Sequence, residues 1–153
     1  MGVASVILTF EPHPLTVLRP ELAPAPITDL KEKIRCFEHL GVEQFWILPF
    51  DRALAAMEPN DFLERVLIER LNPKLLVVGH DFNFGKERRG TLEFLQKFCG
   101  ERGILLEVVP PVMSDGIRVS STEIRQLLRR GDLRLANQFL GRPYSVEESV
   151  IQG

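Results

Sequence analysis

Four short apolar runs alternate along the chain with segments in which apolar residues recur every three or four positions. The runs cover residues 3–10, 44–48, 75–79 and 105–109. Because each run is almost continuously apolar and rich in β-branched residues, it is typical of a strand buried on both faces of a parallel sheet. The intervening periodicity predicts helices near residues 29–40, 59–70, 91–98, 121–130 and 132–140.

Local signals mark where these helices begin and end. Thr28 is predicted to cap the first helix and Gly41 to end it, because a hydroxyl accepts a free N–H and glycine adopts a left-handed conformation. Pro59 is predicted to open the second helix, where its missing N–H is tolerated. The proline-rich residues 14–26 are predicted to form a loop. Strands alternating with helices predict an α/β fold, with a mostly parallel sheet and helices on both faces.

The composition fits one soluble globular domain and argues against some classes of partner. The chain has 153 residues, of which 44% are hydrophobic and 26% charged. The formal net charge of −2 argues against a nucleic-acid partner, which usually requires a strongly basic surface. No stretch is long and apolar enough to span a membrane, so no membrane partner is expected. Cys36 and Cys99 are far apart and lack neighbouring metal ligands, which predicts reduced thiols in a cytoplasmic protein and no structural metal site.

Hydroxyl side chains gather at the predicted start of the helix over residues 121–130. Ser120 followed by Glu123 matches a capping box, in which the two side chains satisfy free backbone N–H groups. The same hydroxyls, N–H groups and helix dipole also form a potential anion site, and capping alone does not explain the arginines on either side. The candidate phosphate ligands are Arg118, Ser120, Ser121, Thr122 and Arg125.

A second candidate lies in the loop after the third predicted strand. It is not a P-loop, because its glycines are one residue too far apart and Glu87 stands where a magnesium-binding hydroxyl is needed. Asp81 between two aromatic residues and two glycines suits a flat ring held by stacking and a polar edge contact. Alternatively, the glycines serve turns and the aromatic rings cover the core. The candidate pocket residues are Gly79, Asp81, Phe84 and Gly85.

Two further loops carry weaker signals. Pro12, His13 and Pro14 follow the first strand, and the prolines fix a rigid wall, although no Asp, Ser or Cys adjoins the histidine to support catalysis. The basic cluster of Lys86, Arg88 and Arg89 is either a solvated loop or a mobile lid over phosphates.

Taken in order, these loops resemble the FAD synthetase domain of the bacterial bifunctional riboflavin kinase/FAD synthetase family. The resemblance covers essentially the whole chain, and the ordered set of segments is specific although each segment alone is weak. It implies a Rossmann-like nucleotidyltransferase fold and an FMN adenylyltransferase that joins AMP from ATP to FMN, giving FAD and pyrophosphate, with Mg²⁺. The segments that carry it are residues 9–14, 49–51, 79–85, 119–125 and 140–144.

The resemblance also implies roles for the candidate residues. Ser120, Ser121, Thr122 and Arg125 would hold the ATP phosphates, with Arg118 alongside. Pro12, His13 and Pro14 would form a wall of the flavin site. Gly79, Asp81, Phe84 and Gly85 would line the nucleotide and flavin pocket.

The main departure from the family pattern is at the front of the chain. The family begins with a strand and a Gly-x-Phe-Asp-Gly-x-His-x-Gly-His turn, which nothing here matches, so the first strand corresponds to the family's second and no catalytic residue is assigned. We therefore expect an N-terminally truncated domain over residues 1–141. Residues 142–153 are expected to be a linker and the start of a truncated riboflavin kinase module.

Two consequences are expected from this truncation. The isolated chain should form little FAD, because the histidines of the missing turn stabilise the transferring phosphate. An exposed sheet edge should favour self-association. Two other functions stay open: a non-catalytic module that binds flavin or nucleotide, and a nucleotidyltransferase with another acceptor, such as a nicotinate or pantetheine phosphate, which the flavin-type loops disfavour.

Overall fold

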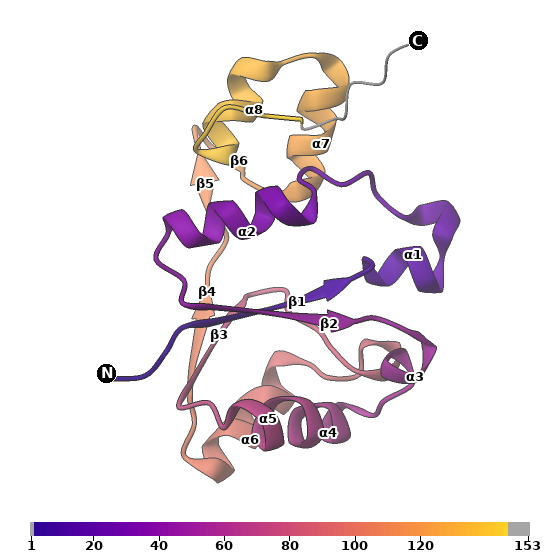
Figure 1. The fold of residues 1–153 in the computed structure, drawn as a ribbon, viewed down its shortest axis with the longest axis vertical. Coiled ribbons are helices and arrows are strands. Elements are labelled where there is room, and N and C mark those ends of the chain that lie inside the picture. The colour runs from indigo at the N-terminus through magenta and orange to yellow at the C-terminus, as the bar shows by residue number, and fades with distance from the viewer. Residues whose placement is uncertain (1, 147–153) are drawn as a thin grey trace. The chain divides into compact units, whose positions relative to one another are not determined.

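The computed structural model describes residues 2–146 and divides the chain into two compact units (Figure 1). Within the described residues, the first unit comprises residues 2–24 and 43–110, and the second comprises residues 25–42 and 111–146. Each unit has its own hydrophobic core, so each is described by itself. None of the helices within residues 2–146 is long and apolar enough to cross a bilayer.

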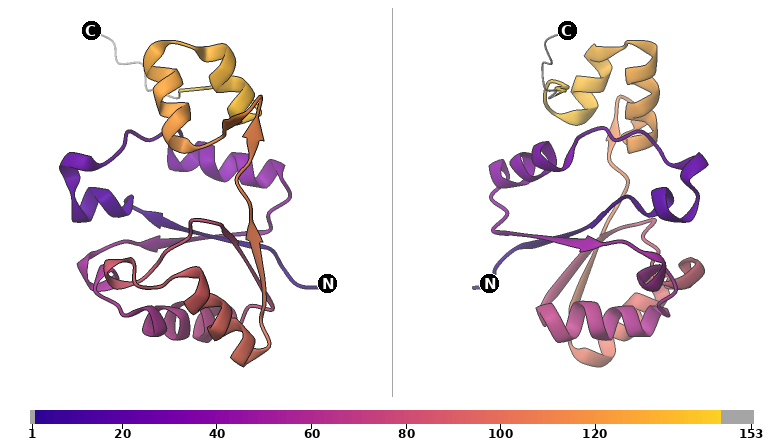
Figure 2. Two further views of the ribbon diagram at one scale, coloured as in Figure 1. Left: turned by 180° about the vertical axis from the view of Figure 1, so that it is seen from behind. Right: turned by 45° about the vertical axis from the view of Figure 1, so that its right-hand side comes forward.

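Two pairs of parallel strands form the sheet layer of the first unit. Strand β1 (Val6–Glu11) pairs with β2 (Gln44–Pro49), and β3 (Leu75–Gly79) pairs with β4 (Leu105–Val109). Figure 2 shows β1 and β2 running side by side in both views. Among the described residues no hydrogen-bonded ladder joins one pair to the other. All four strands therefore form where the apolar runs predict them, and all the pairing between them is parallel.

One face of β3 and β4 is exposed, which corrects the prediction of strands buried on both faces. Along each of these strands half-buried and exposed residues alternate, and the Val77 and Leu105 side chains are 57% and 53% exposed. The opposite face of the strands packs against the helices of the unit. Continuous apolar runs do not distinguish these cases, because an exposed valine and a buried valine look alike in the sequence.

The core of the first unit lies between the strands and two helical segments. One segment is continuous from Pro59 to Leu71, and the other is α6 (Leu92–Arg102). Arg102 ties the two together, because its guanidinium pairs with Glu64 and lies 3.8 Å from the centre of the Phe98 ring. The buried residues are Phe62, Leu63, Val66, Phe84, Leu95, Phe98 and Cys99, against which the strands pack Leu8, Phe10, Trp46, Leu48, Leu76, Val78 and Leu106.

The segment from Pro59 to Leu71 begins as predicted but is not a regular α-helix. Pro59 occupies the first turn of α4 (Pro59–Asp61), where a missing N–H is tolerated. The middle, η2 (Phe62–Ile68), is a π-helix, and α5 (Glu69–Leu71) completes the segment before Asn72 takes a left-handed conformation. The wider turn of a π-helix shifts the side-chain positions from the α-helical period, so sequence periodicity alone does not reveal it.

Residues 14–22 contain short helices where a loop is predicted. Helix α1 (Pro14–Leu18) has proline in its first turn, and the 3₁₀ turn η1 (Pro20–Leu22) does as well. Proline is unfavourable in the interior of a helix but favourable in its first turn. The proline-rich stretch therefore contains two short helices, each of which begins at a proline. A further short helix, α3 (Arg52–Ala55), is capped by Asp51, whose carboxylate accepts the Leu54 N–H at 2.7 Å.

The described part of the second unit, which ends at residue 146, is built from three helices and a small hairpin. Helix α2 (Leu30–His39) is capped by Asp29, which accepts the Glu32 N–H at 2.7 Å, and not by Thr28 as predicted. Helices α7 (Ser121–Arg130) and α8 (Leu133–Leu140) match the predicted ranges closely. They enclose a core of Ile124, Leu127, Ala136 and Phe139.

An antiparallel hairpin precedes α7, and the sequence reasoning missed it. Strands β5 (Met113–Ser114) and β6 (Ile117–Arg118) are joined by Asp115 and Gly116, both with positive φ angles of 50° and 77°. An Asp-Gly pair is a strong signal for a two-residue hairpin turn, but each strand has only two residues, too few to show an alternating pattern.

Residues after α8 are bound to α2 within the second unit. The Glu32 carboxylate forms an ion pair with Arg142 Nη1 at 3.0 Å and accepts a hydrogen bond from Ser145 Oγ at 3.1 Å. The Tyr144 N–H donates to Asn137 Oδ1 at 2.7 Å. The predicted linker over residues 142–153 thus begins along α2, whereas its residues 147–153 lie outside the described part of the chain. The predicted boundary at residue 141 stays a prediction.

The two cysteines should differ sharply in reactivity. Cys99 is 1% exposed and burial raises the pKa of its thiol, whereas the Cys36 thiol is half-buried and lies 3.9 Å from a Glu32 carboxylate oxygen. Because the thiolate is the reactive form, the native chain should show one fast and one slow thiol towards dithionitrobenzoate. Cys36→Ser should remove the fast phase and Cys99→Ser should keep it. Equal rates for both thiols in the native chain would contradict this structure.

Candidate functional site

Ser120 caps α7 and fixes the start of the predicted phosphate site in the second unit. Its Oγ accepts the Glu123 N–H at 3.2 Å, and its carbonyl accepts the Ile124 N–H at 2.9 Å. This confirms the Ser120 half of the predicted capping box. The Glu123 carboxylate pairs with Arg130 Nη2 at 3.2 Å, further along the helix.

The first turn of α7 presents hydrogen-bond donors to solvent. Ser121 and Thr122 are exposed, and within residues 2–146 no protein acceptor is recorded for their backbone N–H groups or hydroxyls. Unsatisfied N–H groups and the positive end of the helix dipole favour an anion here. Arg118 is exposed and lies at the end of the hairpin, paired with Met113 in register, two residues before the cap.

Arg125 has a structural contact that the sequence does not reveal. Its Nε donates to the Ala25 carbonyl at 2.7 Å and so holds the chain that leads into α2. Burial, followed by the neighbouring charge of Arg129, lowers the pKa of the Arg125 guanidinium, which nevertheless stays protonated in proteins. The Arg125 Nε–H is thus used inside the unit, and a bound phosphate would contact the two terminal nitrogens of the guanidinium.

A shallow pocket of about 360 Å³ also lies in the second unit. It is formed by the start of α2 and the segment after α8, and none of the predicted site residues lines it. Glu32 and Arg35 on its wall already bond to each other at 3.6 Å, and Glu32 also holds the segment after α8. Its lining residues are Pro26, Ile27, Thr28, Asp29, Glu32, Arg35, Tyr144, Ser145 and Val146.

In the first unit, Pro12, His13 and Pro14 connect β1 to α1. The peptide bond before Pro12 is cis. His13 caps α1, because its Nδ1 accepts the Leu15 N–H at 3.1 Å, and Pro14 takes the first helical position. The histidine therefore orders the turn, and Nδ1 must be the unprotonated ring nitrogen to accept this bond.

The loop after β3 begins with a tight turn around Asp81. The Gly79 carbonyl accepts the Phe82 N–H at 3.0 Å, and the Asn83 side chain donates to the Asp81 carbonyl at 2.8 Å. A Cβ on Gly79 would lie 3.3 Å from an Asp81 carboxylate oxygen, so glycine lets this carboxylate fold back over the strand end. Asp81 itself is exposed.

Phe84 lies in the core of the first unit, where three other rings surround it. It is 6% exposed, and its ring centre lies 5.8 Å from Phe62, 5.4 Å from Phe82 and 6.1 Å from Phe94. Phe82 stacks on it almost in parallel and is only half-buried. Of these rings, Phe82 is the better placed to meet a flat ligand, and the sequence reasoning missed it because the two phenylalanines are equivalent in the motif.

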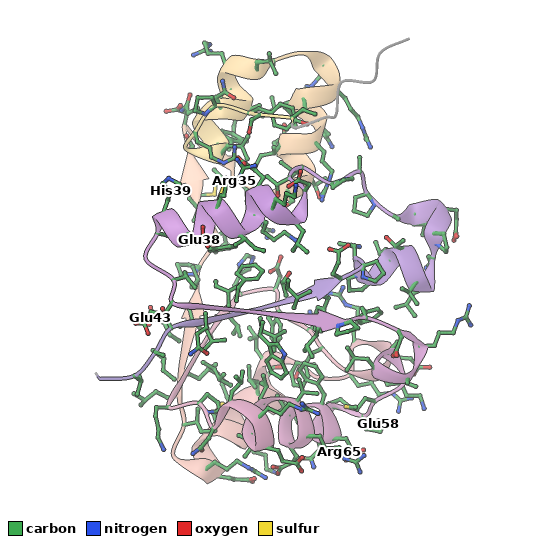
Figure 3. All side chains as sticks on the ribbon, viewed as in Figure 1. Arg35, Glu38, His39, Glu43, Glu58 and Arg65 are labelled. Carbon is green, nitrogen blue, oxygen red and sulfur yellow. The ribbon has the colours of Figure 1, made fainter. Side chains whose placement is uncertain are left out.

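The end of this loop is pinned, which argues against the alternative of a mobile lid. The Lys86 N–H donates to the Met57 carbonyl at 2.8 Å, and Lys86 Nζ and Arg89 Nη1 pair with Glu58 at 3.4 and 3.8 Å. Glu58, labelled in Figure 3, stands just before the helix that starts at Pro59. A Cβ on Gly85 would lie 2.9 Å from Pro59, so the loop backbone is packed directly against that helix start.

No acidic or imidazole cluster accompanies these loops. Within residues 2–146 there is no group of three or more His, Cys, Asp or Glu side chains placed to hold a metal ion. The predicted residues thus form two groups, one around the start of α7 and one at the ends of β1 and β3, each inside its own unit.

The comparisons with known proteins decide the family. A sequence model described as FAD synthetase matches residues 1–123 of this chain. The chain belongs to the FAD synthetase family. The match includes every candidate residue except Arg125, and the resemblance read from the loop motifs is confirmed.

Curated relatives of this member of the FAD synthetase family are longer proteins. The bifunctional riboflavin kinase/FMN adenylyltransferase of Escherichia coli K12 is 36% identical over 148 residues, which cover 97% of this chain and 47% of that protein. The enzymes of the same name from Pseudomonas fluorescens and Haemophilus influenzae are 36% and 34% identical over 153 residues, or 49% and 50% of their lengths. The chain thus spans about half the length of the curated relatives it matches.

A solved structure confirms the fold class. A protein described as the macrolide-efflux protein from Streptococcus pneumoniae superposes with a TM-score of 0.78 and 28% identity, over 93% of this chain and 47% of that one. The predicted α/β nucleotidyltransferase fold is therefore confirmed for this family member.

Two glycines in the first unit should respond oppositely to alanine. A Cβ on Gly90, which is buried, would lie 2.7 Å from the Phe84 ring, so Gly90→Ala should lower the free energy of unfolding by about 1–3 kcal/mol. Gly100 lies in α6 with nothing within 4 Å of its Cβ position, so Gly100→Ala should raise it by roughly 0.5–1 kcal/mol. Urea denaturation measures both. A neutral Gly90→Ala would contradict the close packing of this loop.

Proposed function

We propose that this chain supplies substrate-binding parts of an FMN adenylyltransferase, which transfers AMP from ATP to FMN to give FAD and pyrophosphate. The observation that carries the proposal is the exposed, hydroxyl-rich start of α7, capped by Ser120, inside the segment that matches the FAD synthetase family. The relatives that span about twice this length are named for this activity and for riboflavin kinase. We extend both activities to the whole protein as a proposal.

The chemistry of adenylyl transfer suits such a site. Transfer of AMP requires little covalent chemistry from the protein, but it requires the phosphates to be held in line and their charge to be neutralised. The N–H groups and hydroxyls of Ser121 and Thr122 supply neutral donors at the positive end of the α7 dipole. Arg118 and the terminal nitrogens of Arg125 add positive charge next to these donors.

The flavin is assigned to the loops of the first unit. Pro12, His13 and Pro14 form a preordered turn at the end of β1, and Gly79, Asp81, Phe84 and Gly85 form a pinned loop at the end of β3. Both follow carboxyl ends of parallel strands, which is where ligands bind in α/β sheets. Asp81 offers a polar edge contact, and Phe84 supports the half-buried Phe82 ring against which an isoalloxazine can stack.

Magnesium is proposed to arrive with ATP. Mg²⁺ in nucleotide sites is commonly held by substrate phosphates, water and one or two carboxylates, so a dedicated cluster of acidic side chains is not required. We further propose a cytoplasmic protein without nucleic-acid or membrane partners, in keeping with the formal net charge of −2 and with two free cysteines.

Variants of three neighbouring hydroxyl residues, Ser120, Ser121 and Thr122, separate folding from ATP binding. Ser120→Ala should lower the free energy of unfolding by about 1 kcal/mol, because it removes the cap of α7. Replacing Ser121 and Thr122 together by alanine should leave stability almost unchanged, since both are exposed, but should weaken binding of ATP with Mg²⁺ roughly tenfold or more. Calorimetric titration with ATP and thermal unfolding measure the two effects.

FMN is the matched control ligand. Its binding, followed by the quenching of flavin fluorescence, should be unchanged in the double variant. FAD formation by the isolated chain, assayed in parallel, is expected to be small. Undiminished ATP binding by the double variant would exclude the start of α7 as the phosphate site. Robust FAD formation would overturn the expectation that the histidine turn of the family is needed.

We also propose that the isolated chain self-associates through its exposed strand edges. Unpaired peptide groups on a strand edge pair readily with another chain, and one face of β3 and β4 exposes large apolar side chains such as Val77 and Leu105. Sedimentation velocity at increasing protein concentration should show dimers or larger species. A single monomeric boundary over the whole concentration range would contradict the proposal.

A further inference from the structure

The β5–β6 hairpin carries Arg118 but has little of its own to hold it in one orientation. Each strand has only two residues, and an isolated pair of strands is marginally stable in water. Within the described part of the chain its apolar side chains, Met113 and Ile117, are exposed and contribute little packing. Contacts from outside the hairpin must therefore fix its orientation.

One end of the hairpin is anchored in the second unit. Val119, which follows β6, packs against the core of this unit, and its N–H donates to the Val112 carbonyl at 2.8 Å. The turn at the other end is formed by Asp115 and Gly116, and both residues are exposed. A hairpin fixed only at Val119 would rotate about that point, so a stable orientation requires a second anchor at the turn.

The Gln138 side chain supplies this second anchor from α8 (Figure 1). Its Nε2 donates to Ser114 Oγ at 3.0 Å and to Asp115 Oδ2 at 2.9 Å, and these two bonds form the Gln138 clamp. A carboxylate only accepts hydrogen bonds, which requires the nitrogen and not the oxygen of the amide to face Asp115. Because one acceptor is charged, the bond to Asp115 is the stronger of the two.

Helix α8 is a rigid base for the Gln138 clamp. Phe139, the next residue, and Ala136 are buried in the core that also packs α7. The start of α8 is capped by Asp132, whose carboxylate accepts the Leu135 N–H at 3.1 Å. A side chain on a packed helix holds its partners more precisely than a side chain on a loop. The clamp therefore relates the hairpin to the same core on which α7 rests.

The clamp also determines which face of the hairpin turns towards α8. Ser114 pairs with Ile117 and Met113 with Arg118, and residues directly opposite each other share one face of a ladder. Because successive residues of a strand point to opposite faces, Ser114 and Arg118 lie on opposite faces of the hairpin. Holding the Ser114 face towards α8 therefore directs Arg118 away from α8, two residues before the Ser120 cap.

We propose that Gln138 is a positioning residue for the phosphate site, because by clamping the turn it fixes the direction in which Arg118 presents its guanidinium to ATP. The inference rests on the proposed function, since it takes Arg118 as a phosphate ligand. Gln138 does not touch the phosphates in this arrangement and acts through the hairpin. A charged group that is already in place binds its ligand more tightly than one that must be ordered on binding.

Loss of the clamp should affect ATP binding more than folding. Gln138 and Asp115 are exposed, so water replaces the lost hydrogen bonds, and no core residue of the unit takes part in the clamp. Gln138→Leu, which is similar in size and lacks donors, should therefore shift the midpoint of thermal unfolding by no more than about 2 °C. Hydrogen exchange of the Val119 N–H, which closes the hairpin, should nevertheless become faster.

The test compares ATP binding by the full 153-residue chain with binding by Gln138→Leu, Arg118→Ala and the double variant. In calorimetric titration with ATP and Mg²⁺, Arg118→Ala should weaken binding roughly tenfold and Gln138→Leu at least about threefold. The double variant should bind no more weakly than Arg118→Ala, because the clamp then has no guanidinium to position. An effect of Gln138→Leu through general destabilisation would add to that of Arg118→Ala.

Gln126 on α7 provides a matched control. Its side chain is exposed and has no recorded contact within residues 2–146, so Gln126→Leu should change neither ATP affinity nor Val119 exchange. Additive effects of the two variants, ATP affinity lowered by Arg118→Ala but not by Gln138→Leu, or unchanged Val119 exchange in Gln138→Leu would each overturn this inference and leave the proposed function standing. An unmodified chain that binds no ATP would overturn both.

Discussion

The packing of Phe62 is the contact on which the first unit depends. Its side chain is 5% exposed and lies between the rings of Phe10 and Phe84. These rings come from the end of β1 and from the loop after β3, so one buried side chain fixes the places where two family loops leave the sheet. Burying aromatic rings contributes both apolar area and geometric preference, which makes such a cluster both stabilising and specific. The candidate flavin loops are ordered because their anchors lie in the core.

In the second unit, polar contacts rather than aromatic packing fix the position of the candidate site. Ser120 caps α7, and by doing so it sets the direction in which the next two residues present their N–H groups and hydroxyls. Capping and anion binding use different donors of the same helix start, so the two interpretations of this segment are compatible. Arg125 shows the limit of motif reading, because part of its guanidinium holds the Ala25 carbonyl.

Much of this architecture could be predicted from the sequence, and the exceptions have physical causes. The apolar runs predict the four strands. Helical periodicity, together with serine and glycine at the helix ends, predicts α7 and α8, because these signals act over a few residues. The exposure of Val77 could not be predicted, since it depends on which face of the strand the helices cover. The π-helical turn at Phe62 and the pinning of Lys86 by Glu58 depend on contacts between segments far apart in sequence.

Candidate site residues were easier to place than to interpret. The loop motifs lie at the ends of β1 and β3, as the sequence predicts, but Phe84 is a core ring and Phe82 is the more accessible neighbour, because only packing distinguishes them. Similarly, His13 serves as a cap in a turn that the prolines order. Residue type and spacing thus indicate where a ligand is expected, and tertiary contacts decide which atoms remain available to it.

The central claim is that the start of α7 holds the phosphates of ATP. The most direct measurement is a titration of the ¹⁵N-labelled chain with ATP and Mg²⁺, followed by amide chemical shifts. The largest shifts are predicted at the N–H groups of Ser121 and Thr122, which have no recorded acceptor in the described residues. ATP binding that leaves these two amides unshifted, while others move, would contradict the claim.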